Sequence, residues 1–163
     1  MDNPLYRLAA DVGSALKARG LALATAESCT GGWIGEAVTA VPGSSDWYER
    51  GFITYTNVAK REMLGVAADT LEKFGAVSEE TVKAMVMGAL AHSHAQIAVA
   101  VSGVAGPSGG TPAKPVGTVC IAWGRHDSAP FAETRYFAGD REAVRRQSVA
   151  CALTGVLALV RGK

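Results

Sequence analysis

Apolar strand-like runs alternate with amphipathic helical segments along this chain, and this alternation restricts the fold more than any other feature. The pattern predicts strands over residues 21–25, 51–56 and 97–101, then two neighbouring strands over residues 116–123 and 131–137. Helices with one apolar face fill the intervals, and a helix that is apolar on much of its circumference follows the last strand. Early alternation with a late strand pair is typical of an α/β fold, here a three-layer α/β/α sandwich with a mixed, mainly parallel sheet.

Length and composition favour one domain, residues 1–163, without a linker or repeat. The net charge of +1 gives no broad basic field for long nucleic acid, whereas a small anionic ligand needs only a local pocket. The three widely spaced cysteines suggest neither a disulfide framework nor a zinc site, and free thiols fit a reducing compartment. The sequence shows no leader and no apolar run of the ~18 residues that a membrane span needs. We therefore expect a cytoplasmic protein that binds no nucleic acid, no membrane and no metal.

Three polar or glycine-containing segments follow predicted strands: residues 26–32, 55–60 and 102–110. The carboxyl ends of parallel strands meet at one edge of a sheet, and open α/β sheets bind ligands outside that edge. The positions of these segments therefore predict a ligand site there.

Ser28 lies between a predicted strand and a helix that Gly31 and Gly32 open. A helix N-terminus offers unpaired N–H groups and partial positive charge, which can stabilise an oxyanion, and glycines let a ligand approach the backbone. Ser28 is thus a candidate nucleophile. Two alternatives stay open: Ser28 or Thr30 is only the helix cap, or Cys29 is the nucleophile, since a helix N-terminus can lower a thiol pKa.

A serine nucleophile needs a base, and the three histidines lie at a helix end or in a polar turn, where none is well placed. Lys60 follows a strand whose end is expected near Ser28, and a buried lysine can lose its proton near neutral pH. The adjacent Arg61 cannot be deprotonated. Tyr55, at the end of the same strand, could orient the serine or stack on an aromatic ring. The alternatives are a solvated lysine and a packed tyrosine.

A second glycine-rich loop, Ser102–Gly110, can expose N–H groups to a phosphate, although it is neither a P-loop nor a dinucleotide fingerprint. Arg141 lies in the first turn of the predicted last helix, with Arg145 one turn further along the same face. A cation at a helix N-terminus opposes the helix dipole, and a bound phosphate would explain why these arginines lie there. The alternatives are a plain flexible loop and surface ion pairs with neighbouring acids.

Taken together, these segments resemble one family. The motifs are Ala-Glu-Ser-Cys-Thr-Gly-Gly at residues 26–32, Thr-Tyr-Thr-Asn-Val-Ala-Lys at 54–60, Ser-Gly-Val-Ala-Gly-Pro at 102–107, and Gly-Asp-Arg at 139–141. In this order, over nearly the whole chain, they are similar to the CinA C-terminal domain family. Stand-alone members of that family are nicotinamide-nucleotide amidohydrolases with a three-layer α/β/α fold, and they are usually homodimers or higher homo-oligomers. The resemblance implies deamidation of nicotinamide mononucleotide to nicotinic acid mononucleotide and ammonia, without metal or cofactor.

On the family pattern Ser28 is the nucleophile, Lys60 is the base and Tyr55 assists. The resemblance also implies a set of residues that line the substrate site: Thr30, Gly31, Gly32, Ser102, Gly103, Ala105, Gly106, Arg141 and Arg145. Two other functions remain open. One is a non-catalytic nucleotide-binding or regulatory module of the competence/damage-inducible type. The other is an amidase or esterase for a substrate without phosphate, whose activity would survive replacement of Arg141.

Overall fold

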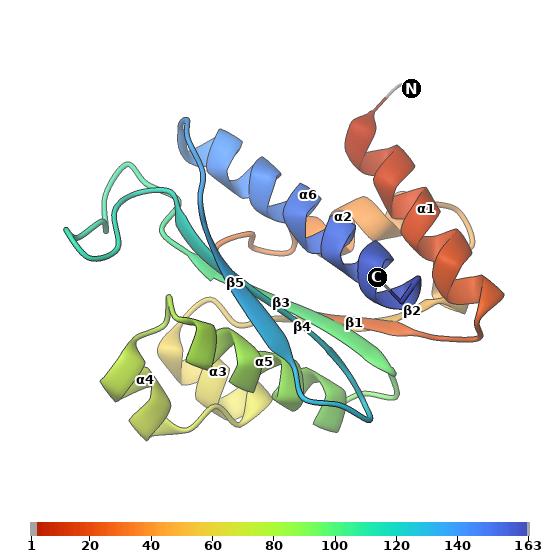
Figure 1. Cartoon of the computed structure of the whole chain (residues 1–163), viewed down its shortest axis with the longest axis horizontal. Coiled ribbons are helices and arrows are strands. Elements are labelled where there is room, and N and C mark those ends of the chain that lie inside the picture. The colour runs from red at the N-terminus through yellow and green to blue at the C-terminus, as the bar shows by residue number, and fades with distance from the viewer. Residues whose placement is uncertain (1–2, 163) are drawn as a thin grey trace.

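The computed structural model describes residues 3–162 and shows one five-stranded sheet with helices on both faces (Figure 1). The strands lie in the order β2-β1-β3-β4-β5. The strand bounds are β1 Leu23–Glu27, β2 Tyr48–Ile53, β3 Ile97–Gly103, β4 Thr118–Arg125 and β5 Phe131–Tyr136. The helices are α1 Pro4–Ala18, α2 Trp33–Thr39, α3 Asn57–Leu64, α4 Ala68–Phe74, α5 Glu79–Ala91 and α6 Arg141–Val160, with a 3-10 turn η1 at Ser44–Asp46.

The sheet is mixed. Strand β1 pairs in parallel with β2 and β3, whereas β3 with β4 and β4 with β5 pair antiparallel. The antiparallel part arises because no helix crosses over between β3 and β4 or between β4 and β5, and parallel neighbours need such a crossover. The predicted α/β fold with a mixed sheet is confirmed, although parallel pairing is limited to the first three strands in sequence order.

Helices α1, α2 and α6 cover one face of the sheet, and α3, α4 and α5 cover the other (Figure 1). Strand β3 shows how the sequence builds both interfaces. Its larger residues Ile97, Val99 and Val101 point into the cluster formed with α1 and α6, whereas Ala98 and Ala100 face α5. Alternate residues of a strand point to opposite faces, so the small alanines let α5 approach the sheet closely.

The strand boundaries differ from the predicted ranges by at most three residues, most clearly at β2. This strand begins at Tyr48 rather than at Gly51, so that it includes the charged residues Glu49 and Arg50. Strand β2 lies at the edge of the sheet, where charged side chains reach solvent and block further strand pairing. A search for apolar runs does not detect such a segment.

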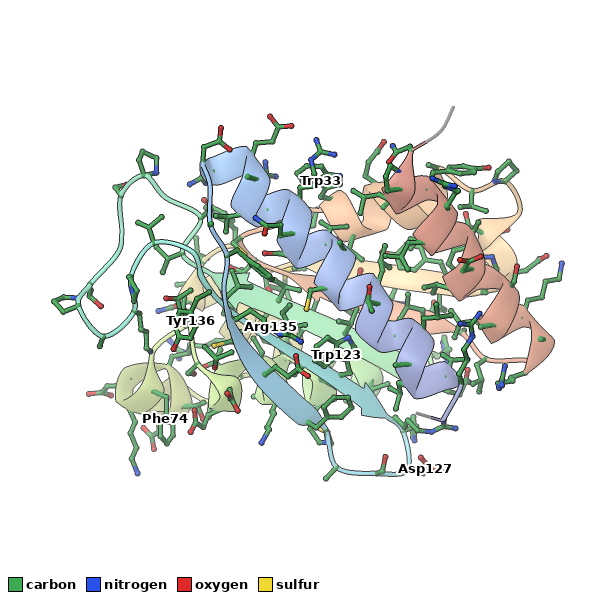
Figure 2. All side chains as sticks on the ribbon, turned by 45° about the horizontal axis from the view of Figure 1, so that its top comes forward. Trp33, Phe74, Trp123, Asp127, Arg135 and Tyr136 are labelled. Carbon is green, nitrogen blue, oxygen red and sulfur yellow. The ribbon has the colours of Figure 1, made fainter. Side chains whose placement is uncertain are left out.

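Helix α6 differs from the expectation that no segment resembles a membrane span. Among the helices that the structure describes, it is the one long and apolar enough to cross a membrane by length and composition, with a mean hydropathy of 1.3. One face of it is nevertheless buried in the core, through residues such as Val149 and Leu153. Trp123, labelled in Figure 2, lies between the sheet and α6 and donates from Nε1 to the Ala152 carbonyl oxygen at 2.9 Å. Packing against the sheet therefore explains the apolar composition of α6.

Candidate active site

A cavity of about 300 Å³ lies at the carboxyl ends of β1 and β3, beside the segment that follows β2. The three segments singled out in the sequence meet there, joined by the start of α6 and the turn before α5. The lining residues are Ser28, Cys29, Tyr55, Lys60, Ala76, Val77, Ser102, Gly103, Val104, Ala105, Gly106, Ser108, Gly109 and Arg141. The volume suits a small ligand.

Ser28 and Lys60 are in direct contact in this cavity. The Lys60 Nζ atom lies 2.9 Å from Ser28 Oγ, 2.8 Å from the Thr54 carbonyl oxygen and 3.4 Å from the Tyr55 carbonyl oxygen. Helix α3 places the lysine: Thr56 caps it by accepting a hydrogen bond from the Ala59 N–H, and Lys60 lies in its first turn. From there the side chain points back toward the end of β2, where it is only 1% exposed.

Burial lowers the pKa of the Lys60 ammonium to about 8, since the charged form loses its hydration. The partners of Nζ are a hydroxyl and two carbonyl oxygens, and none of the cavity-lining side chains that the structure describes is a carboxylate. A substantial fraction of Lys60 is therefore neutral near pH 8 and can accept a proton from the neighbouring hydroxyl.

Cys29 lines the same cavity, but its thiol is the poorer nucleophile. Burial raises the pKa of Cys29 to about 12, and the nearby Arg145 guanidinium offsets this only in part. The thiolate is the reactive form of a cysteine, so a thiol that stays protonated at neutral pH is a weak nucleophile. This difference favours Ser28 over its neighbour.

The turn after β1 is fixed by Glu27, a buried acid whose role the sequence analysis did not identify. Its carboxylate accepts hydrogen bonds from Thr30 Oγ1 at 2.6 Å, Ile34 N at 2.8 Å and Gly35 N at 3.0 Å. The carboxylate therefore takes N–H groups at the N-terminus of α2, where stabilisation of an oxyanion was expected. A strand-end glutamate followed by a glycine-opened helix is the sequence signal for such a cap.

The two predicted arginines have different environments. Arg141 lines the cavity, donating from Nη1 to the Gly106 carbonyl oxygen at 2.7 Å and from Nη2 to the Tyr55 hydroxyl at 3.2 Å. Arg145 lies outside the cavity lining and donates to the carbonyl oxygens of Cys29 at 3.0 Å and Thr30 at 3.1 Å. Arg145 thus holds the turn that carries Ser28.

Trp33, labelled in Figure 2, lies at the start of α2, with the Arg145 guanidinium 5.4 Å from its ring. This contact ties α6 to α2, and the two carbonyl contacts tie α6 to the Ser28 turn. The contacts of the Arg145 side chain therefore depend on packing between elements that lie far apart in the sequence.

The remaining predicted residues also divide into those that line the cavity and those that do not. Ser102, Gly103, Ala105 and Gly106 line the cavity, whereas Thr30, Gly31 and Gly32 do not. Thr30 is fully buried against Glu27. Gly31 and Gly32 have φ of 60° and 105°, so their glycine character serves the turn itself.

Several lining residues were not among those predicted. Ala76 and Val77 come from the turn before α5, and Ser108 and Gly109 come from the far part of the glycine-rich loop. Their segments are visible in the sequence, but the long loop and turn do not reveal which residues face inward. Within residues 3–162, no group of three or more His, Cys, Asp or Glu side chains is arranged to hold a metal ion.

Thr54 carries a buried hydroxyl without a hydrogen-bond partner in the described structure. Replacing Thr54 with valine keeps the shape and removes the unpaired group, so we expect a gain in unfolding free energy of about 1 kcal/mol. Urea denaturation measures this change. The matched control is Thr25→Val. The Thr25 hydroxyl lies 2.8 Å from the Tyr48 hydroxyl, so its loss should lower the unfolding free energy. Destabilisation by Thr54→Val equal to that of the control would show that the hydroxyl has a partner.

The chain is similar to known proteins in both sequence and structure. A model of the CinA C-terminal domain matches residues 5–160. The chain is 57% identical over 157 residues to the nicotinamide-nucleotide amidohydrolase PncC of Pseudomonas putida, covering 96% of this chain and 98% of that protein. It is 51% identical to the Escherichia coli K12 protein of the same name, covering 93% and 92%. The crystal structure of competence/damage inducible protein CihA from Agrobacterium tumefaciens superposes with a TM-score of 0.94 at 44% identity, covering 98% and 97% of the two chains. The chain therefore belongs to the CinA C-terminal domain family.

Proposed function

We propose that this protein hydrolyses the carboxamide of nicotinamide mononucleotide to nicotinic acid mononucleotide and ammonia, a reaction of NAD salvage, with Ser28 as nucleophile and Lys60 as base. The observation that carries the mechanism is the 2.9 Å contact between Ser28 Oγ and a buried lysine amine inside a cavity. The substrate is supported by the two PncC relatives, both named nicotinamide-nucleotide amidohydrolases.

The first step is attack by Ser28 Oγ on the carboxamide carbon while the serine proton moves to Lys60 Nζ. The two carbonyl oxygens near Nζ, those of Thr54 and Tyr55, accept the N–H groups of the neutral amine. The nitrogen lone pair is then directed at the Ser28 hydroxyl. Such an arrangement fixes the position of the base before the substrate binds.

The negative oxygen formed in this step needs hydrogen-bond donors. In the Ser28 turn, the Gly31 N–H already donates to the Ser28 carbonyl oxygen, and Glu27 takes the N–H groups at the start of α2. The N–H groups of Cys29, Ala105 and Gly106, all of which line the cavity, donate no hydrogen bond within residues 3–162. We therefore assign oxyanion stabilisation to N–H groups of this set rather than to the N–H groups at the start of α2.

Collapse of the intermediate breaks the carbon–nitrogen bond, and the Lys60 ammonium returns its proton to the departing ammonia. The product is an ester between Ser28 Oγ and the nicotinoyl group of the nucleotide. Water then attacks this ester with neutral Lys60 again as base, which releases the acid and regenerates the Ser28 hydroxyl.

Arg141 is the one lining residue with a permanent positive charge among those described, and we assign it to the phosphate. Replacing Arg141 with alanine should raise KM for the mononucleotide about 10- to 100-fold, the effect of a lost hydrogen bond to a charged group. KM for the riboside, which lacks the phosphate, should change little. Steady-state kinetics with both substrates and with Arg141→Lys as the conservative control measure this difference. An equal loss for both substrates would assign Arg141 only to holding Gly106 and Tyr55.

The pH dependence of the reaction follows from the state of Lys60. The base must be neutral, and burial lowers its pKa to about 8, so kcat/KM should rise with pH through about 8 and then level off. Initial rates in buffers of constant ionic strength give this profile. A rate that is flat across this pH range, or falls through it, contradicts the assignment of Lys60 as the base.

We also propose a single domain over residues 1–163, a cytoplasmic location and a homodimer or higher homo-oligomer without nucleic acid or membrane partners. The single domain is supported by two apolar clusters that share one sheet. The location is supported by three free cysteines. Self-association is supported by exposed apolar side chains, among them Ile53 and Val58. Light scattering coupled to size-exclusion chromatography tests the oligomeric state.

The activity is tested by measuring ammonia release from nicotinamide mononucleotide with the purified protein, with and without EDTA. We expect release at an equal rate in both samples. Thermal stabilisation by the nucleotide without any ammonia release would instead indicate the non-catalytic binding module.

A further inference from the structure

Resting on the proposed function, we propose that this protein also transfers the nicotinoyl-nucleotide group from Ser28 to small neutral amines, with hydroxylamine as the probe. The product is the nucleotide hydroxamate. The activity follows from the way the cavity supplies a base and space for the second half of the reaction.

The first support is the place that the leaving ammonia vacates. In the acylation step ammonia departs from the carbon bonded to Ser28 Oγ and takes its proton from Lys60 Nζ. In the described structure Lys60 Nζ lies 2.9 Å from Ser28 Oγ. The same space and the same base must accept the incoming nucleophile of the second step. A site that releases ammonia by this route is therefore shaped for a neutral amine nitrogen as well as for water.

The second support is the absence of a separate device for choosing water. None of the lining side chains that the structure describes is a histidine or a carboxylate, so Lys60 is the available base for any attacking group. Choice between water and a competing nucleophile then depends on size, charge and intrinsic reactivity. Hydroxylamine is small, largely neutral near the pH where Lys60 loses its proton, and more reactive than water toward esters.

The limits of the activity follow from burial and charge. Lys60 is 1% exposed, which leaves little room around Nζ for a substituent on the attacking nitrogen. Arg141 and the protonated fraction of Lys60 make the lining positive and disfavour cationic amines. At the mouth, Tyr55 is 58% exposed, so that small solutes can reach the interior. The acceptors are therefore small and neutral.

The step balances without any further reagent. The hydroxylamine nitrogen forms a bond to the acyl carbon, the bond from that carbon to Ser28 Oγ breaks, and the nitrogen proton passes through Lys60 to Ser28 Oγ. In total, the nucleotide carboxamide and hydroxylamine give the nucleotide hydroxamate and ammonia. No group is oxidised or reduced.

The test incubates the protein with nicotinamide mononucleotide and increasing hydroxylamine, and quantifies hydroxamate and acid by liquid chromatography and mass spectrometry. Ser28→Ala is the control for the uncatalysed reaction, and O-benzylhydroxylamine is the bulky control. We expect at least about 100-fold more hydroxamate than with Ser28→Ala, since loss of a serine nucleophile costs several orders of magnitude. The ratio of hydroxamate to acid should rise in proportion to hydroxylamine, and the bulky amine should give no adduct.

Two negative results have different meanings. Hydrolysis of the mononucleotide without hydroxamate above the Ser28→Ala level would overturn the transfer activity and leave the hydrolysis intact. Absence of both products, with a folded protein, would overturn the proposed function on which the transfer rests.

Discussion

Replacing Ser28 with alanine is expected to reduce ammonia release from nicotinamide mononucleotide by on the order of 10⁴-fold or more, the scale of loss when a serine hydrolase loses its nucleophile. The hydroxyl forms the only proposed covalent link to substrate, and without it the first step has no serine proton for Lys60 to take. KM or the binding constant should change little, because Ser28 contributes one hydroxyl to a much larger lining. Ammonia detection and nucleotide binding by calorimetry measure the two effects.

The matched control for this variant is Cys29→Ala, one position along the same turn. Its thiol is held protonated by burial, with a pKa of about 12, so its removal should leave most of the rate. The opposite pattern, a fully active Ser28 variant and an inactive Cys29 variant, would assign the nucleophile to the cysteine.

Replacing Lys60 with methionine should reduce kcat by on the order of 10³-fold, the range of a lost general base. Methionine fills a similar volume, so that the cavity and α3 keep their packing. Lys73→Met is the matched control, since this lysine on α4 does not line the cavity that contains Ser28. Retention of the pH-dependent rise in rate by Lys60→Met would show that another group is the base.

The Lys60 variant should also change how stability depends on pH. The pKa of Lys60 is lowered from 10.5 to about 8 by burial, so the unfolded chain binds this proton more readily than the folded protein between these values. Protonation of Lys60 therefore lowers the unfolding free energy, and this loss is complete below about pH 8. The loss disappears as the pH rises from about 8 toward 10.5. The stability of the wild type relative to Lys60→Met should therefore increase over this interval, which urea denaturation at several pH values would show.

The fold could be predicted from the sequence to a large extent. Strand β3 is buried on both faces, so its continuous apolar run is unambiguous, and helix α5 has a clear cap at Ser78, which accepts from the Thr81 N–H. Strand β2 was placed three residues late, because an edge strand does not need apolar residues at each position.

The candidate site was predictable where function depends on residue type and place along the chain. Ser28 and Lys60 each follow a strand, and their meeting needs only that β1 and β2 pair in parallel, as they do. The environment of Arg145 could not be predicted, because its contacts with the Cys29 and Thr30 carbonyl oxygens depend on how α6 packs across the sheet. The role of Glu27 was missed although its place at a strand end before a glycine-opened helix is a sequence signal, because its three donors are identified only once the turn is placed.

The most direct test of the central claim is to trap the covalent intermediate. The protein is mixed with nicotinamide mononucleotide, quenched in acid within the first turnovers, digested and mapped by mass spectrometry. An ester of the nicotinoyl nucleotide on the Ser28 hydroxyl, absent from Ser28→Ala, is the expected result. Attachment of the same group to Cys29, or turnover at full rate with no modified peptide under any quench condition, would contradict the account.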